Sequence, residues 1–148
     1  MKNHRYNLGA LFLVVAISLG IVFIIDLQFP VGIEEYIKSP FYNQFGPLAI
    51  TVELLVSAYY LLIRHTKTNF AFALFAFTAL LDPIFNLTGI FTSLVPIYAT
   101  VIFVLSALIG VWVAFTDAFD TGRISIIEVI GSFMLGVAVE LFFNGMFS

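Results

Sequence analysis

Three acidic residues stand inside long apolar stretches of the sequence, where other groups of the protein must satisfy a carboxylate. They are Glu53, Asp82 and Glu140. Asp82 lies in the middle of the run from Phe70 to Leu94, and Pro83 follows it directly. An acid at the centre of a membrane-spanning helix costs about 3 kcal/mol, and a proline inside a helix leaves one backbone carbonyl without its partner. These positions are therefore the first candidates for a functional site.

The spacing of the acids predicts that they share one level of the folded chain. Glu53 and Asp82 lie about equally far from a basic turn near Lys67, and Glu140 lies far enough along the last expected helix to reach the same level. At a rise of about 1.5 Å per residue, all three reach the outer half of a hydrocarbon core about 30 Å thick. We expect no Lys or Arg there, and we expect the acids to face one another, because lipid-facing acids are very unfavourable.

Each acid also has polar neighbours on its own helix face, because residues four apart stack on one side of a helix. The predicted faces comprise Thr78, Asp82 and Asn86; Glu53, Ser57 and Tyr60; and Ser132, Gly136, Glu140 and Asn144. Small residues four apart, as in the last of these faces, permit close approach of a neighbouring helix.

Two interpretations of this polar layer remain open. Clustered acids without a basic partner share protons or attract a cation, as in ion-coupled carriers. The candidates for such a cation or proton site are Asp82, Glu53, Glu140, Asn86, Thr78 and Tyr60. Alternatively, protonated carboxyls hydrogen-bond to nearby hydroxyls or to the carbonyl freed by Pro83 and tie helices together. The structural interpretation is favoured at Glu53, where Ser57 and Tyr60 are near, and Glu140 could also extend to water at the outer interface.

The composition indicates that lipid is the solvent for much of the chain. Of 148 residues, 61% are hydrophobic and only 10% are charged, whereas soluble domains are about 25% charged. The formal net charge of -3 gives no reason to expect nucleic acid as a partner. The absence of Cys excludes disulfides, thiol catalysis and iron–sulfur clusters. Only two His are present, both beside basic residues at expected membrane edges, so we expect no metal site and no cofactor.

These features predict an all-α, polytopic membrane protein, with a single integral membrane domain over residues 1–148 built as a bundle of about five transmembrane helices. The expected spans are residues 8–25, 47–63, 70–89, 96–115 and 126–144, with an outer loop at 26–45. In that loop Ile33, Tyr36 and Ile37 fall at helical spacing and predict a short interfacial helix; a surface loop packed over the bundle is the alternative. A re-entrant stretch at 86–96 would change the division between the third and fourth spans.

Two local patterns fix a helix start and an orientation. Ser125 and Glu128 match a capping box, in which each side chain accepts a hydrogen bond from a free amide at the beginning of a helix. The basic residues set the orientation, because cytoplasmic loops carry an excess of Lys and Arg. With the N-terminus in the cytoplasm and the C-terminus outside, only Lys38 is outside, and the inner set is Lys2, Arg5, Arg64, Lys67 and Arg123.

No nucleophile–base pair and no metal-ligand set is visible, so we expect no catalytic residues, and the sequence gives little support for an enzyme. We expect an integral subunit or assembly partner of a larger complex in the cell membrane, whose partners are lipids and other integral subunits or further copies of the chain. The alternative is a small proton- or cation-coupled transporter or channel that uses the intramembrane carboxylates. A lipid-acting membrane enzyme is a third hypothesis, with only Asp117, Asp120 and His65 as candidate groups at the cytoplasmic face.

Overall fold

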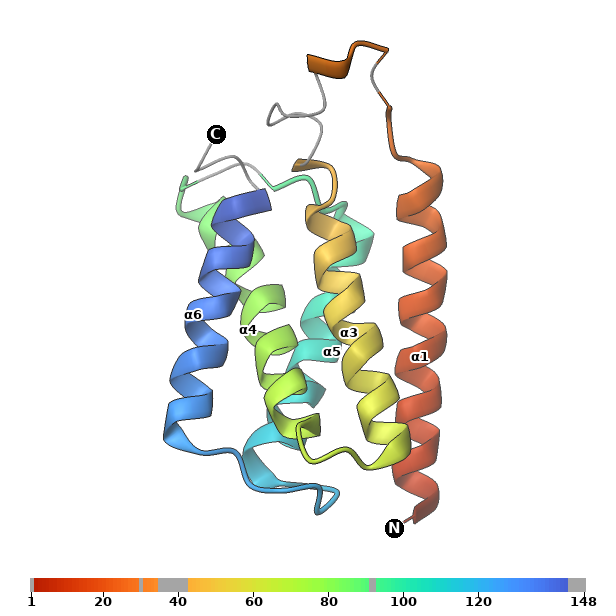
Figure 1. Ribbon diagram of the computed structural model, residues 1–148, viewed down its shortest axis with the longest axis vertical. Coiled ribbons are helices and arrows are strands. Elements are labelled where there is room, and N and C mark those ends of the chain that lie inside the picture. Colours follow the sequence, from red (N-terminus) through yellow and green to blue (C-terminus); the bar gives the residue numbers. More distant parts are fainter. Residues whose placement is uncertain (1, 30, 35–42, 91–92, 144–148) are drawn as a thin grey trace.

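The computed structural model describes residues 2–29, 31–34, 43–90 and 93–143, and these form an all-helical bundle without strands. Successive helices run in alternating directions (Figure 1). Their bounds are α1 (Lys2–Ile25), α3 (Gly46–Ile63), α4 (Thr68–Leu87), α5 (Ile97–Thr116) and α6 (Ile126–Phe143). The prediction of an all-α chain with five long apolar helices is confirmed. The expected interfacial helix falls mostly on residues outside the described ranges, as does Lys38.

The five helices are long and apolar enough to cross a membrane, which indicates a multi-pass membrane protein. Large apolar side chains remain exposed on the outer faces of all five, for example Ile17 on α1, Leu105 on α5 and Met134 on α6. A water-soluble monomer rarely exposes so much contiguous apolar surface. This exposure fits the outer surface of a multi-pass membrane protein.

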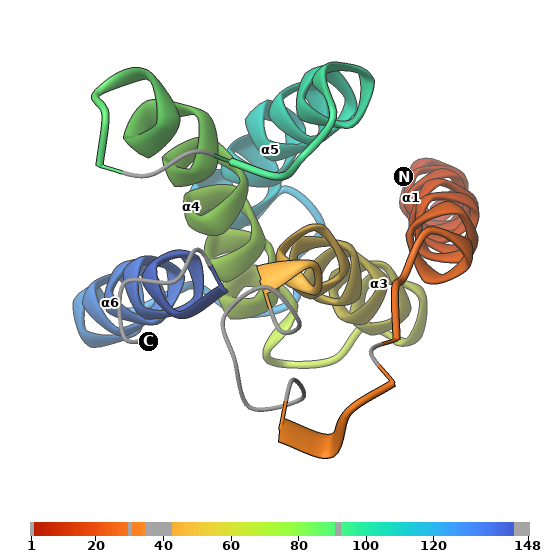
Figure 2. The same cartoon turned by 90° about the horizontal axis from the view of Figure 1, so that it is seen from above.

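Helix α4 is the centre of the arrangement. It packs against α3, α5 and α6, whereas α1 packs mainly against α3 at the edge of the bundle. The view along the bundle axis shows α4 between α5 and α6, with α1 beyond α3 (Figure 2). A run of alternating Ala and Phe explains this position, because Ala lets neighbouring helices approach while Phe72 and Phe75 fill the space between them; both Phe side chains are fully buried. Phe72 contacts Phe12 of α1, with ring centroids 5.7 Å apart.

Helix α1 begins at Lys2, earlier than the expected span, and its first turns contact the end of α3. The Arg5 guanidinium is buried and donates hydrogen bonds to the backbone oxygens of Leu61 and Leu62, at 2.6 and 2.8 Å. The last carbonyls of a helix have no partner within it. Arg5 therefore caps α3 from a neighbouring helix, where a positive charge also complements the helix dipole.

All Lys and Arg residues within the described ranges lie at one end of the bundle, which we call the basic end: Lys2, Arg5, Arg64, Lys67 and Arg123. It contains the start of α1, the α3–α4 turn and the α5–α6 connection (Figure 1). The Lys67 ammonium pairs with the Glu128 carboxylate at 3.1 Å. The predicted capping box is confirmed, because the Glu128 amide donates to the Ser125 hydroxyl and the Ser125 amide donates to the Glu128 carboxylate, both at 3.2 Å.

Candidate functional site

Asp82 is buried, and its partner lies in the loop between α4 and α5. The Ser93 hydroxyl donates to Asp82 Oδ2 at 2.6 Å, and the Ser93 amide donates to Asn86 Oδ1 at 2.9 Å. Asp82 and Asn86 lie one helical turn apart on the same face of α4, so one loop residue satisfies both side chains. The pair thus holds the loop against the end of α4, and Pro83 lies within the helix without ending it.

Glu53 lies against Thr78 rather than at the exact level of Asp82. Its carboxylate contacts the Thr78 side chain, and the Thr78 hydroxyl also donates to the Leu74 oxygen at 2.9 Å. The other Glu53 oxygen, Oε2, is buried and has no hydrogen-bond partner among the residues that the structure describes. The short α3–α4 turn places Thr78 as far from the start of α4 as Glu53 is from the end of α3, so Asp82 lies one turn farther from the basic end.

Thr78 is the point where α3, α4 and α6 come together. A Cβ atom added at Gly136 of α6 would lie 3.2 Å from Thr78 Oγ1 and 3.3 Å from Phe77 Cβ. That is tighter than an ordinary side-chain contact, so the glycine favours the close approach of α6 to α4 at this level. Ser132, one turn earlier on α6, is fully buried and donates to the Val129 oxygen at 2.8 Å. The predicted small-residue pair therefore faces the interior of the bundle.

Glu140 is buried, with only 2% of its surface exposed. Within the described ranges, no three His, Asp or Glu side chains come close enough to hold a metal ion. Asp82 meets the Ser93 hydroxyl and Glu53 meets the Thr78 side chain. Asn144, which was predicted on the same face as Glu140, lies outside the described residues.

Tyr60 and Ser57 do not bond the Glu53 carboxylate. The Tyr60 ring stacks on the His65 ring, with centroids 4.2 Å apart and an interplanar angle of 11°. The Ser57 hydroxyl donates to the Glu53 backbone oxygen at 2.8 Å, a bond that Ser and Thr commonly make inside apolar helices. Tyr60 therefore belongs to the α3–α4 turn, and the hydroxyl that meets Glu53 comes from α4.

The most extensively bonded polar group of the basic end was not predicted from the sequence. We call it the turn network; it comprises Asn69, Asp117, Thr121 and Gly122. Asp117 Oδ1 accepts from Asn69 Nδ2 at 2.8 Å, from the Thr121 amide at 3.1 Å and from the Gly122 amide at 3.3 Å. Asn69 Nδ2 also donates to the Gly122 oxygen at 2.8 Å, and the Thr121 hydroxyl donates to Asn69 Oδ1 at 3.3 Å. The network joins the start of α4 to the turn after α5.

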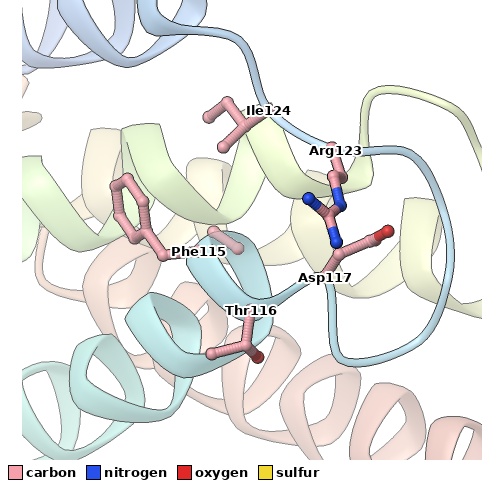
Figure 3. Close-up of a pocket in the computed structure, with 6 residues that line it drawn as sticks. Phe115, Thr116, Asp117, Arg123 and Ile124 are labelled. Atoms are coloured by element: carbon pink, nitrogen blue, oxygen red, sulfur yellow. The ribbon is translucent and has the colours of Figure 1, made fainter.

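A cavity of about 320 Å³ lies beside this network, at the C-terminal end of α5. It is lined by Ala114, Phe115, Thr116, Asp117, Arg123 and Ile124. Figure 3 shows the Arg123 guanidinium extending from the α5–α6 connection toward Asp117, with Phe115 and Ile124 on the other side. One wall is thus apolar, and the other carries one positive and one negative side chain.

Comparison with protein-family models, with curated proteins and with solved structures gave no match to this chain. The geometry of the described residues alone therefore supports the proposals below.

Proposed function

We propose that this protein is an integral subunit or assembly partner of a larger complex in the cell membrane, without a catalytic centre of its own. The observation that carries the proposal is that polar side chains on the helices bond to other segments of the same chain. Asp82 and Asn86 hold a loop through Ser93, and Asn69 joins two turns. These groups tie the chain to itself, which is the role expected of polar side chains in a scaffold.

The outer helices support this proposal by what they leave uncovered. Helix α6 packs on α4 and α1 packs mainly on α3, so each contacts the rest of the bundle along one side only. Their remaining faces carry exposed apolar side chains such as Met134 on α6 and Ile17 on α1. In a bilayer such faces contact lipid or the helices of a partner. We place the basic end in the cytoplasm, with the end of α6 outside, because Lys and Arg accumulate on the cytoplasmic side.

Site-specific cross-linking tests the assembly. The chain contains no Cys, so a single introduced thiol is unique. Met134 is 64% exposed on α6, and Ser132 on the same helix is buried. We expect Met134→Cys, tagged and cross-linked in native membranes with a thiol-reactive bifunctional reagent, to capture an integral membrane protein or a second copy in fixed stoichiometry. Ser132→Cys is the matched control and should capture nothing.

The proposal is wrong if scanning α1 and α6 with single thiols yields no adduct and the protein extracts in mild detergent as a stable, monodisperse monomer. A subunit of a complex would instead co-purify with its partners, and its yield would fall when they are missing.

A second candidate is a small proton- or cation-coupled transporter, favoured by the buried, unpartnered Oε2 of Glu53. An acid that lacks a full set of donors in an apolar bundle is a group that can exchange a proton. Proton or Na⁺ flux into liposomes tests this role. Glu53→Gln should abolish a measured flux, whereas Glu128→Gln, at the start of α6, should leave it unchanged. An unchanged flux in Glu53→Gln would exclude Glu53 as the carrier group.

A further inference from the structure

The cavity at the end of α5 combines three features that no internal role explains. Arg64 donates to the Asp120 backbone oxygen, Lys67 pairs with Glu128, and Arg5 caps α3. Among the Lys and Arg side chains that the structure describes, only Arg123 forms no hydrogen bond or ion pair within the chain, and it lines the cavity. An uncommitted guanidinium at a cavity wall is a donor set suited to a phosphate.

The second feature is the Asp117 carboxylate. Three donors engage its Oδ1 atom, while no described residue donates to Oδ2. The turn network therefore fixes the orientation of the carboxylate and leaves one acceptor oxygen uncommitted. Asp117 and Arg123 line the same cavity and form no ion pair with each other. A ligand with one negative and one positive group matches this pair better than a simple anion, which Asp117 would repel.

The third feature is the apolar wall beside the charged one. Phe115 and Ile124 line the cavity together with Ala114. Close to it, Trp112 is 53% exposed and packs edge-to-face on Phe119, with ring centroids 5.9 Å apart. Half-exposed Trp rings at helix ends mark the level of lipid headgroups. A ligand at this level has a polar head and an apolar tail, and a cavity of about 320 Å³ is large enough for a small polar head.

We propose that this cavity binds the headgroup of an aminophospholipid, with its phosphate on Arg123 and its ammonium on Asp117. Phosphatidylethanolamine is the simplest lipid of this class. Pockets with basic side chains at the cytoplasmic ends of membrane helices are recurrent lipid-headgroup sites. The proposal depends on the membrane placement proposed above and is independent of whether the chain has protein partners.

The single tryptophan of the chain provides the measurement. Trp112 lies one helical turn before Thr116 of the cavity wall, so a lipid held there with brominated acyl chains quenches its fluorescence. The full chain is reconstituted in vesicles of phosphatidylcholine containing increasing fractions of brominated phosphatidylethanolamine, phosphatidylglycerol or phosphatidylcholine. We expect phosphatidylethanolamine to bind about fivefold better than phosphatidylcholine, the factor that about 1 kcal/mol represents.

Matched variants assign that preference to the cavity. Arg123→Gln should reduce the relative binding constant to about one, and Arg123→Lys should restore part of it. Asp117→Asn keeps the Oδ1 acceptor that the turn network needs and removes the charge, so it should also abolish the preference. The controls are Arg64→Gln and Asp120→Asn, which remove the same charges at the same end but do not line the cavity; the fivefold preference should persist in both. Circular dichroism establishes that each variant is helical.

Each other outcome overturns the proposal at an identifiable step. Stronger binding of phosphatidylglycerol than of phosphatidylethanolamine would mean that the site recognises the phosphate alone. If soluble phosphoethanolamine in detergent displaces the bound lipid as effectively as phosphatidylethanolamine does, the ligand is a free metabolite of the same chemistry rather than a lipid. Equal quenching by all three lipids would leave the membrane placement intact and remove the site. No quenching by any lipid would contradict the membrane placement itself.

Discussion

The carboxylates inside the bundle and the carboxylate of Asp117 at the basic end meet their hydrogen-bonding needs differently. Asp117 Oδ1 alone accepts from three donors. Asp82 accepts from the Ser93 hydroxyl. Glu53 contacts Thr78, but one of its buried oxygens has no partner among the described residues.

The difference follows from the backbone. At a turn the amides of residues such as Thr121 and Gly122 are free, so one carboxylate can collect several of them. Inside a helix every amide already donates to the carbonyl four residues back, so only side chains can serve an acid. In an apolar bundle these are few. Asp82 and Glu53 therefore depend on the few side chains that reach them, Ser93 and Thr78.

The largest expected effect is the loss of the turn network. Asn69→Ala removes the two Nδ2 bonds to Asp117 and Gly122 from a fully buried site. We expect a loss of about 3 kcal/mol, because a charged acceptor loses one of its three donors and the Gly122 oxygen loses the second bond from the same buried amide. Thermal or urea unfolding in detergent measures the effect. Asn86→Ala, at an exposed amide that accepts one bond, is the matched control and should cost about 1 kcal/mol. Equal losses of stability in Asn69→Ala and Asn86→Ala would mean that the turn network and the α4–α5 loop do not differ in this way.

The next effect concerns Asp82. Asp82→Ala removes the acceptor of the Ser93 hydroxyl and leaves a small cavity near the α4–α5 loop, so we expect a loss of about 2 kcal/mol. Asp82→Asn keeps one side-chain oxygen and should cost less than half as much. The same unfolding measurement compares the two, and limited proteolysis of the α4–α5 loop should accelerate in Asp82→Ala only. If both variants cost the same, the charge rather than the acceptor is what Asp82 supplies.

A smaller effect is expected at the surface ion pair of the basic end. Lys67→Met removes the bond to Glu128. Since the Lys67 side chain is 57% exposed, we expect a loss of about 0.5 kcal/mol. High salt should produce the same loss in the parent protein and none in the variant. A loss of stability that is larger than this and independent of salt would mean that Lys67 stabilises the protein by the packing of its side chain rather than by its ion pair with Glu128.

The smallest effect is expected at Glu53. Glu53→Gln preserves the shape of the side chain and can donate from its amide, so the free energy of unfolding should change by less than about 0.5 kcal/mol. A change this small in the free energy of unfolding would mean that the Glu53 carboxylate does not hold the helices together. A loss as large as that of Asp82→Ala would show instead that the Glu53 carboxylate supports the junction of α3, α4 and α6.

The sequence was sufficient for the helices and for the capping box, but not for the partner of Glu53, where Thr78 takes the place expected of Ser57 and Tyr60. Apolar length and turn residues predicted five helices, and the capping box of Ser125 and Glu128 follows from residues three apart. Gly136 was placed correctly on a face of close approach because small residues four apart have few other uses in an apolar helix.

Contacts between distant segments could not be predicted in the same way. Asn69 and Asp117 are 48 residues apart, and each is an ordinary residue in a polar turn until the helices bring them together. Arg5 was counted only as a charge, although it reaches across 56 residues to the Leu61 oxygen. Counting residues from Lys67 places Glu53 and Asp82 at the same level. The turn between α3 and α4 is short, however, so Thr78 rather than Asp82 lies opposite Glu53. Side-chain reach and turn geometry, rather than periodicity, decide such pairings.

The bond between Arg5 and the end of α3 gives one residue two successive tasks. In the orientation proposed above, a positive charge at the start of the first helix opposes its translocation during insertion and so helps to orient the nascent chain, before α3 exists. Once α3 arrives, the same guanidinium is enclosed against the oxygens of Leu61 and Leu62. Orientation of the chain and capping of α3 are thus separate in time. A lysine at this position would serve orientation equally well but would cap α3 less well, because one ammonium cannot make the forked pair of hydrogen bonds that a guanidinium makes.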